Sequence, residues 1–158
     1  MLDRAFQKKD GATKDDCERH LAKRLLTDVR REHLHLKLIV IEDALASNRP
    51  HIRHLKELNL RFILGAKASD HRYLFDWIDM SKQTQHYEYT DQAGSYHRFC
   101  FLNGAPLNDA NYNLEINFIE YWETSTSGKT QHFSWVTDLW LSYSIRFNNA
   151  AAICSNAR

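Results

Sequence analysis

Two adjacent carboxylates, Glu42 and Asp43, end the short apolar segment "LIVIE", and small residues and a helix start follow them. In open α/β sheets, reacting groups cluster beyond the carboxyl ends of the strands, where loops leave space for ligands. A carboxylate there can bind Mg²⁺ or Mn²⁺ together with phosphate oxygens, because these hard cations prefer oxygen ligands. The alternative is structural, since either acid can accept a hydrogen bond from the next turn. Spacing alone leaves both interpretations open.

Three basic side chains, Lys67, His71 and Arg72, stand at or after the end of a second apolar segment, "RFILGAK" (61–67). If the two segments are parallel strands, their carboxyl ends lie at one rim of the sheet, the rim that carries Asp43. Cationic side chains at that rim can contact the phosphates of DNA. We therefore predict a DNA-binding role for the three residues, with ordinary solvated charges as the alternative.

Histidines offer a second metal hypothesis. His51 and His54 lie three apart on one expected helix, and His33 and His35 alternate just before the first strand. A structural zinc site needs four ligands, and no cysteine or carboxylate is spaced to complete the set. Solvated histidines are the favoured interpretation. The sequence contains no Ser/His/Asp order, P-loop or Gly-x-Gly-x-x-Gly pattern, so acyl transfer and nucleotide-cofactor chemistry have no support.

Helices and strands alternate in the first half of the chain. Apolar residues recur at helical spacing over 16–31, and the β-branched run "LKLIVIE" (36–42) is typical of a strand buried on both faces. Asn48 with Pro50 predicts the start of a second helix, and Asp70 is the expected cap of a third. Strand, helix and strand make a βαβ unit with parallel pairing.

After residue 83 the pattern changes to aromatic-rich, roughly alternating segments separated by turn residues, which predicts an antiparallel meander. The segments are "TQHYEYTD", "SYHRFCFLN", "NLEINFIEYWET" and "TQHFSWVTD". Their aromatic side chains are expected in the core, with stacking on bases as the alternative. We divide the chain into an α/β core (1–83), a β-rich insertion (84–133) and a return segment with a divergent tail (134–158).

Composition narrows the protein class. Lys and Arg total 21 against 20 Asp and Glu, so no global basic field indicates nucleic acid. The three cysteines are odd in number and far apart, which favours reduced thiols. No apolar run reaches the ~20 residues of a membrane span, and the first residues lack the apolar centre of a signal peptide. We expect a cytoplasmic protein with no membrane partner.

Several of these segments together resemble the central part of the DDE-type transposases of bacterial insertion sequences. The resemblance covers about residues 10–141 and rests on the whole pattern. It is carried by "KDDCERHLAKRLL", "LIVIEDALASNRPHIRHLKELNLRFILGAKASDHRYLFDWID", "LNDANYNLEINFIEYWE" and "FSWVTDL".

The resemblance implies a ribonuclease-H-like fold in which two Asp and one Glu hold two divalent metals, Mg²⁺ or Mn²⁺, for DNA strand cleavage and transfer. It implies that Asp43 is the second of these acids and therefore a catalytic and metal-binding residue. It also implies that "FILGAK" is the next strand and that a β insertion precedes the helix carrying the Glu. The implied partners are the DNA ends of an insertion sequence.

The departures from this pattern lead to the expected function. Before Leu36 the chain has room only for a helix, so the first acid has no match, and no Glu follows Glu123. We expect an incomplete ribonuclease-H-like core (helix, strand, helix, strand, helix), truncated at both ends and inactive alone, whose first strand has an open apolar edge. The alternatives are a non-catalytic remnant that binds DNA or full-length transposase as an inhibitor, and an unrelated α/β domain in which Asp43 is a cap.

Overall fold

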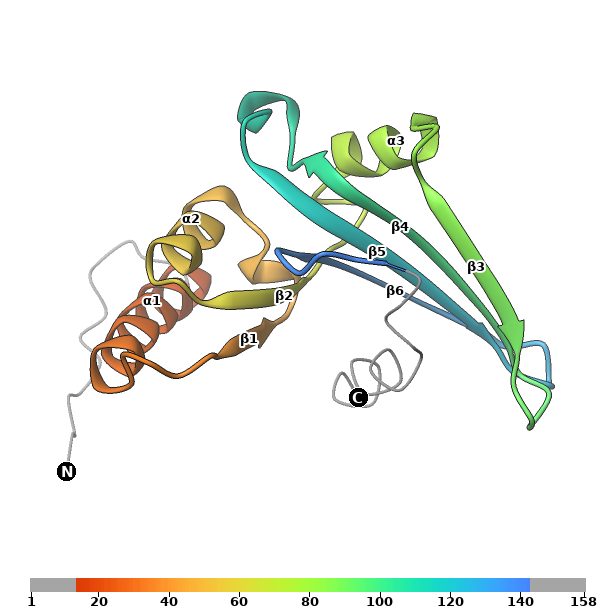
Figure 1. Cartoon of the computed structure of the whole chain (residues 1–158), viewed down its shortest axis with the longest axis horizontal. Coiled ribbons are helices and arrows are strands. Elements are labelled where there is room, and N and C mark those ends of the chain that lie inside the picture. Colours follow the sequence, from red (N-terminus) through yellow and green to blue (C-terminus); the bar gives the residue numbers. More distant parts are fainter. Residues whose placement is uncertain (1–13, 143–158) are drawn as a thin grey trace.

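The computed structural model describes residues 14–142, and their side chains from residue 18 onward. These residues form an α/β structure in which one mixed six-stranded sheet carries three α-helices, with strand order β1-β2-β6-β5-β4-β3 (Figure 1). In chain order the elements are α1 (Lys14–Glu32), β1 (Ile39–Glu42), η1 (Ala44–Ala46), α2 (Arg49–Glu57), β2 (Arg61–Gly65), α3 (Arg72–Met80), β3 (Gln85–Thr90), β4 (Tyr96–Pro106), η2 (Asp109–Asn111), β5 (Glu115–Thr124) and β6 (Thr130–Thr137).

The predicted βαβ unit is confirmed. β1 pairs with β2 in parallel, in a register that sets Val40 against Phe62 and Glu42 against Leu64. The connecting helix α2 begins as the sequence predicts, because the Asn48 side chain accepts a hydrogen bond from the His51 N–H at 3.1 Å and Pro50 occupies the first turn. Parallel pairing brings the carboxyl ends of β1 and β2 to one rim of the sheet.

The antiparallel meander is also confirmed. β3, β4, β5 and β6 pair in sequence order, and β6 then pairs antiparallel with β2, setting Leu64 against Val136. The sheet is therefore continuous across the predicted ranges 1–83 and 84–133. The assignment to a ribonuclease-H-like fold is more specific than the α/β architecture described here, and it remains a prediction.

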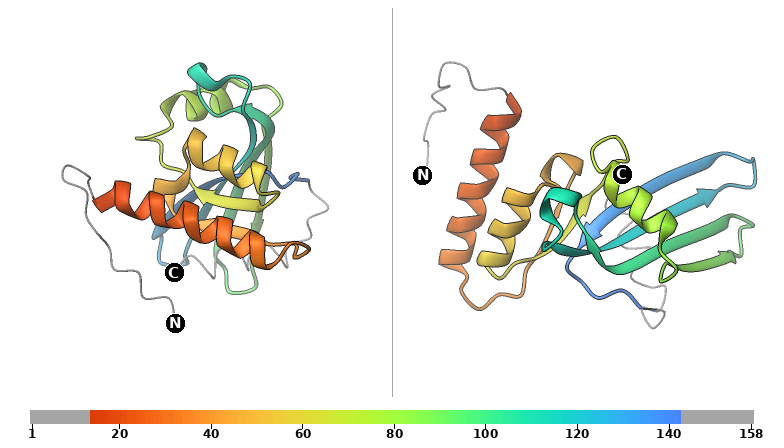
Figure 2. Two further views of the ribbon diagram at one scale, coloured as in Figure 1. Left: turned by 90° about the vertical axis from the view of Figure 1, so that its left-hand side faces the viewer. Right: turned by 90° about the horizontal axis from the view of Figure 1, so that it is seen from above.

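The two faces of the sheet differ in their cover. On one face, α2 and α3 pack over Phe62, Leu64, Phe118 and their neighbours to form the larger core (Figure 2). The opposite face carries a smaller cluster centred on Ile63, Phe99, Tyr121 and Trp135. Side chains alternate between the two faces along each strand, so β2, β4, β5 and β6 each supply both clusters.

Two details depart from the expectations. The strand predicted to be buried on both faces, β1, lies at the edge of the described sheet, and none of its residues is fully buried. Helix α3 begins at Arg72 with His71 as its N-cap, without a side-chain cap bond, so Asp70 is not the cap. Asp70 instead accepts a hydrogen bond from the neighbouring Ser69 hydroxyl at 2.9 Å. The predicted tail lies outside the described residues from 143 onward.

Within the part of the chain that the structure describes, no helix is both long and apolar enough to cross a membrane.

Candidate functional site

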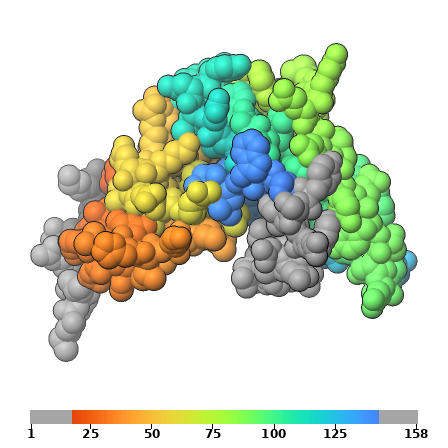
Figure 3. All heavy atoms as spheres, in the orientation of Figure 1, coloured from red at the N-terminus to blue at the C-terminus, as the bar shows by residue number. Residues whose placement is uncertain are grey.

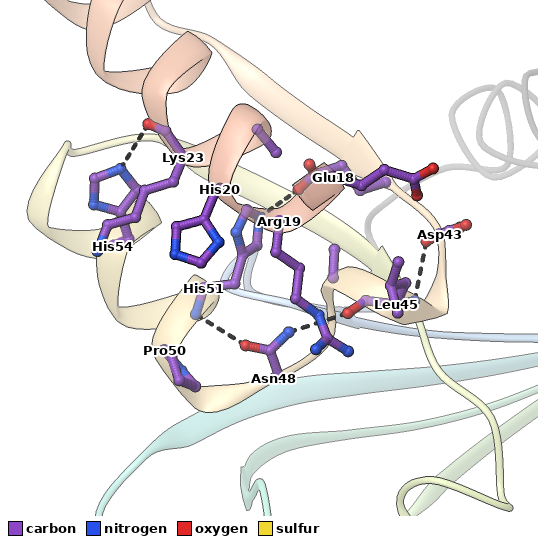
Figure 4. A pocket seen from close by; sticks show the side chains of 13 residues that line it. Glu18, Arg19, His20, Lys23, Asp43, Leu45, Asn48, Pro50, His51 and His54 are labelled. Atoms are coloured by element: carbon purple, nitrogen blue, oxygen red, sulfur yellow. Dashed lines mark hydrogen bonds and ion pairs between the residues drawn. The ribbon is translucent and has the colours of Figure 1, made fainter. Parts of the chain in front are cut away.

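A pocket of about 740 Å³ opens between α1, the carboxyl end of β1 and the start of α2 (Figure 4). Its ionisable lining residues are Glu18, Arg19, His20, Lys23, Glu42, Asp43, His51 and His54, and its other lining residues are Ala22, Leu45, Ala46, Asn48 and Pro50. The rim that the sequence identifies as a ligand site is therefore the edge of a pocket.

Asp43 lies at this edge in extended backbone, directly after β1. Its Oδ1 accepts a hydrogen bond from the Leu45 N–H at 3.0 Å, so the carboxylate caps the short helix η1. The side chain is exposed, and in Figure 4 it lies on the side of the pocket away from His54. The structural interpretation of Asp43 is thus observed, and Oδ2 has no partner in that cap.

Glu42 is held differently from its neighbour. Its Oε2 lies 2.5 Å from the Nε2 of His51, whose side chain is only 9% exposed while that of Glu42 is 24% exposed. The pair ties the end of β1 to the first turn of α2. One carboxylate oxygen of Glu42 is thus held in a pair with His51.

His54 fastens α1 to α2. Its Nε2 lies 3.2 Å from both the Lys23 carbonyl oxygen and the Thr27 hydroxyl, and its side chain is 11% exposed. An Nε2–H donor satisfies the carbonyl. The imidazole thus has a structural role at the back of the pocket. The interpretation of His51 and His54 as solvated histidines was wrong, because both side chains are nearly buried and hydrogen-bonded.

Gly65 explains how the two strand ends come so close. A Cβ at this position would lie 2.8 Å from the Ala44 backbone nitrogen and 3.1 Å from the Asp43 carbonyl carbon. Both neighbours are backbone atoms, which cannot move aside as a flexible side chain would. The absence of a side chain at Gly65 therefore sets the position of the turn that carries Asp43.

The predicted DNA-binding residues lie outside this pocket lining. His71 is 8% exposed, and its Nε2 lies 2.8 Å from the Ser47 hydroxyl, which itself donates to the Ala44 carbonyl at 2.9 Å. His71 Nε2–H is therefore the donor to Ser47, and burial lowers the pKa of His71, against smaller opposing effects of Asp70 and Ser47. His71 joins α3 to the turn that begins at Asp43, as a neutral buried group.

Lys67 and Arg72 are exposed beyond the end of β2. The Arg72 side chain is 90% exposed, with its Nε 3.9 Å from Asp76 one turn later on α3. Because β1 and β2 are parallel, Lys67 follows the same rim as Asp43. The DNA-binding role of Lys67 and Arg72 stays a prediction, whereas His71 is buried and bonded to Ser47 and is not exposed to a phosphate.

The donor set can be compared with the divalent metals that the resemblance implies. Among residues 14–142, no three or more His, Cys, Asp or Glu side chains gather closely enough to hold a metal ion. Oδ1 of Asp43 accepts the capping hydrogen bond, and Oε2 of Glu42 is paired with His51. These residues do not fit a pair of metal ions, which requires several oxygen ligands around each.

Some of the pocket was not identified from the sequence. Helix α1 contributes Glu18, Arg19 and Lys23 to the lining. The local sequence does not indicate this, because it depends on how the helix packs. The Glu42–His51 pair had a weak signal in the sequence. An acid at the end of a strand and a histidine in the first turn of the next helix often lie at one rim of the sheet. Gly65 near the end of a buried strand is the usual sign of a close backbone approach.

No protein-family model and no curated protein matches this sequence.

Proposed function

We propose that the chain is related to DDE-type DNA transposases of ribonuclease-H-like fold, with Asp43 corresponding to one of their metal-binding acids. One observation carries the proposal: Asp43 stands at the carboxyl end of a parallel strand, exposed at the edge of a pocket. Ligands of open α/β sheets bind at that position. The parallel β1–α2–β2 unit followed by an antiparallel meander is the order of elements that the resemblance implies.

The same geometry favours a site in residues 14–142 that has no DNA-cleaving or DNA-joining activity of its own. Transfer of a phosphoryl group between DNA strands by two metals needs each ion to be held by several carboxylate or phosphate oxygens. Asp43 is one carboxylate, and its neighbour Glu42 is committed to His51. We therefore expect these residues to bind Mg²⁺ or Mn²⁺ weakly and not to cleave or join DNA by themselves.

The test is a Mn²⁺ titration of the purified chain, followed through the amide signals of residues 41–48. We expect selective paramagnetic broadening that is abolished in Asp43→Asn, a change that keeps a capping side chain. Asp76→Asn, which alters an exposed carboxylate on α3, is the matched control. No broadening around Asp43 would leave the cap as its only role and would contradict the proposal.

DNA contacts by the rim can be tested separately. Binding through phosphates weakens as salt is raised, in proportion to the number of contacts. We expect Lys67→Gln and Arg72→Gln each to lower affinity for duplex DNA and to reduce the salt slope, while Lys82→Gln, an exposed change beyond α3, has no effect. Equal affinity in all three variants would remove this rim from the DNA-binding surface.

A second candidate function is a non-catalytic protein that binds DNA or a full-length transposase as an inhibitor. The observation that favours it is the edge at β1, which no other strand of residues 14–142 covers and where Ile39 and Ile41 are about half exposed. Adding the purified chain to an active transposase distinguishes the two functions. Formation of mixed oligomers with reduced transposition would support inhibition, and unchanged transposition would exclude it.

A further inference from the structure

The edge of the sheet at β1 has the features of a protein–protein interface. β1 is the last strand of the described sheet and pairs only with β2 within it. Ile39 is 52% exposed and Ile41 is 53% exposed, and both point to the face opposite α2. An apolar strand with unpaired backbone groups is a ready template for another strand.

Exposed apolar side chains concentrate at this end of the molecule. Ten large hydrophobic residues are exposed in the described chain, and six of them fall between residues 21 and 41. These six are Leu21, Leu25, Leu34, Leu36, Ile39 and Ile41. They belong to α1, β1 and their connection, the red and orange end of the molecule in Figure 3. Among them, Ile39 and Ile41 stand two apart on one face of β1, so these two form an apolar pair at the edge of the described sheet.

The backbone of β1 shows which groups are available. The Arg61 N–H donates to the Leu38 carbonyl at 3.1 Å, so Leu38 directs its carbonyl toward β2. Backbone groups alternate in direction along a strand, so Val40 also faces β2. The N–H and C=O groups of Ile39 and Ile41 therefore point outward, away from β2.

We propose that the occupant of this edge is a second copy of the chain, joined through antiparallel pairing of β1 with the partner's β1. A two-fold axis at Val40 sets Ile39 opposite the partner's Ile41. Both residues direct their backbone groups outward, so they can exchange hydrogen bonds as a pair. A two-fold axis requires this kind of self-complementary surface.

Charge complementarity selects the register. With the axis at Val40, Lys37 lies opposite the partner's Asp43, and the symmetric pair repeats at the other end of the strand. An axis at Ile39 would set Lys37 against the partner's Ile41, and an axis at Ile41 would set Ile39 against the partner's Asp43. Only the register centred on Val40 matches charge with charge and apolar with apolar.

The contacts already made within one copy are compatible with this pairing. Asp43 uses Oδ1 for the Leu45 N–H, which leaves Oδ2 for the partner's Lys37. Ile41 is level with Ile63 of β2 on the same face, so the apolar row of one copy continues into the row of the other. The dimer would extend one sheet across both copies.

The first test is the oligomeric state by sedimentation velocity over a range of concentrations. We expect reversible dimers, a shift to monomers in Ile41→Lys, and no change in Met80→Lys, which alters a side chain that is 76% exposed at the end of α3. Edge lysines are a common way for proteins to prevent strand pairing. A monomeric wild type at every concentration would overturn the proposal, as would dimers unaffected by Ile41→Lys.

A charge exchange tests the register. Lys37→Glu alone and Asp43→Lys alone each place like charges opposite one another, and we expect dimer dissociation constants about tenfold higher or more. A mixture of the two variants restores both opposite-charge pairs, so we expect heterodimers of nearly wild-type affinity. Circular dichroism of each variant checks folding. Well-folded variants that fail to pair in the mixture would exclude this register.

Hydrogen exchange gives a readout residue by residue. We expect the amides of Ile39 and Ile41 to become protected as protein concentration rises, and the amide of Val40, which faces β2, to change little. Protection that appears elsewhere in the chain and not at Ile39 and Ile41 would place the interface on another surface. These experiments contain no metal or DNA, so their outcome tests the dimer by itself. The Mn²⁺ titration, which also involves Asp43, is made at concentrations where the chain is monomeric, so the dimer and the proposed function stand or fall separately.

Discussion

The parallel end of the sheet and the antiparallel meander use polar side chains for different purposes. β1 and β2 have four and five residues, and the polar groups at the carboxyl end of β1 line a pocket. β4 and β5 have eleven and ten residues, and many of their polar groups pair with one another. Short parallel strands that end at one rim leave side chains available for ligands, whereas long antiparallel strands provide a partner for most of theirs.

One face of the meander carries a chain of hydrogen-bonded side chains. His97 Nδ1 lies 2.8 Å from the Tyr121 hydroxyl, which donates to Glu123 at 3.2 Å, and His97 Nε2 lies 3.2 Å from Asp91. Tyr89 stacks on the His97 ring at a centroid distance of 4.6 Å. These groups satisfy one another inside an aromatic row, so their role is structural.

The other face of the meander pairs its charges in a similar way. Arg98 lies 4.0 Å from the centre of the Trp122 ring, and Glu120 lies 2.8 Å from His132 Nε2. Burial raises the pKa of Glu120, partly offset by the hydrogen bond from His132. Cys100 is buried nearby, and burial raises the pKa of its thiol to about 11, so it is a poor nucleophile at neutral pH.

The largest expected effect comes from breaking the core that both regions share. Phe118 is fully buried on β5 and packs edge-to-face on Phe75 of α3, with ring centroids 5.0 Å apart. We expect Phe118→Ala to lower the free energy of unfolding by about 3–5 kcal/mol, because it leaves a cavity. Urea denaturation measures this, with Tyr112→Ala, at a 61% exposed position, as the control. Equal losses in both variants would contradict a core shared through Phe118.

A smaller effect is expected at the contact that shapes the pocket. Gly65→Ala puts a Cβ 2.8 Å from the Ala44 nitrogen, so the turn carrying Asp43 must move. We expect a loss of about 1–3 kcal/mol in the free energy of unfolding. We also expect amide chemical-shift changes centred on residues 43–47 and not on the meander.

Gly104→Ala is the comparison, because a Cβ there meets no atom within 4 Å and only its positive φ of 71° is strained. Shifts confined to residue 65 itself would show that the turn does not depend on this contact.

Removing the cap from Asp43 tests its structural role by itself. Asp43→Ala loses the acceptor for the Leu45 N–H, and we expect the free energy of unfolding to fall by about 1 kcal/mol. Asp43→Asn should retain most of that stability while losing the charge. Thermal unfolding of the three proteins measures the cap, and equal stability of the alanine and wild-type proteins would show that the cap contributes nothing.

The smallest expected effect is the response of the meander to acid. The hydrogen bond from His97, followed by that from the Ser95 N–H, lowers the pKa of Asp91. A lowered pKa means that the carboxylate stabilises the fold above its unfolded pKa, near 3.9, and that this stability is lost as the pH falls through the folded value. We expect Asp91→Asn to flatten the decline in urea midpoint below about pH 4. An unchanged decline would contradict a role for Asp91, and Asp76→Asn is the control.

The order and type of the elements follow from local patterns. Helical spacing, β-branched runs, the Asn48–Pro50 start and the alternating aromatic segments predicted all three α-helices and the six strands. The cap of α3 was predicted wrongly at Asp70. His71, one residue later, occupies that place because its side chain is drawn inward to Ser47.

The sequence by itself also determined that Asp43 follows a strand and that an apolar edge was to be expected at "LIVIE". The prediction that this strand is buried on both faces was wrong, because β1 lies at the edge of the described sheet and Ile39 and Ile41 are about half exposed. Only the tertiary structure decided that β2 pairs with β6, that α1 closes one side of the pocket, and that Glu42 is taken by His51. The first two join residues far apart in the chain, and local periodicity carries no information about them. Glu42 and His51 are nine residues apart, but their pairing depends on how α2 packs against the end of β1. Whether a carboxylate is free or paired depends on such contacts. The sequence could therefore suggest two roles for Asp43 but could not predict which side chains surround it.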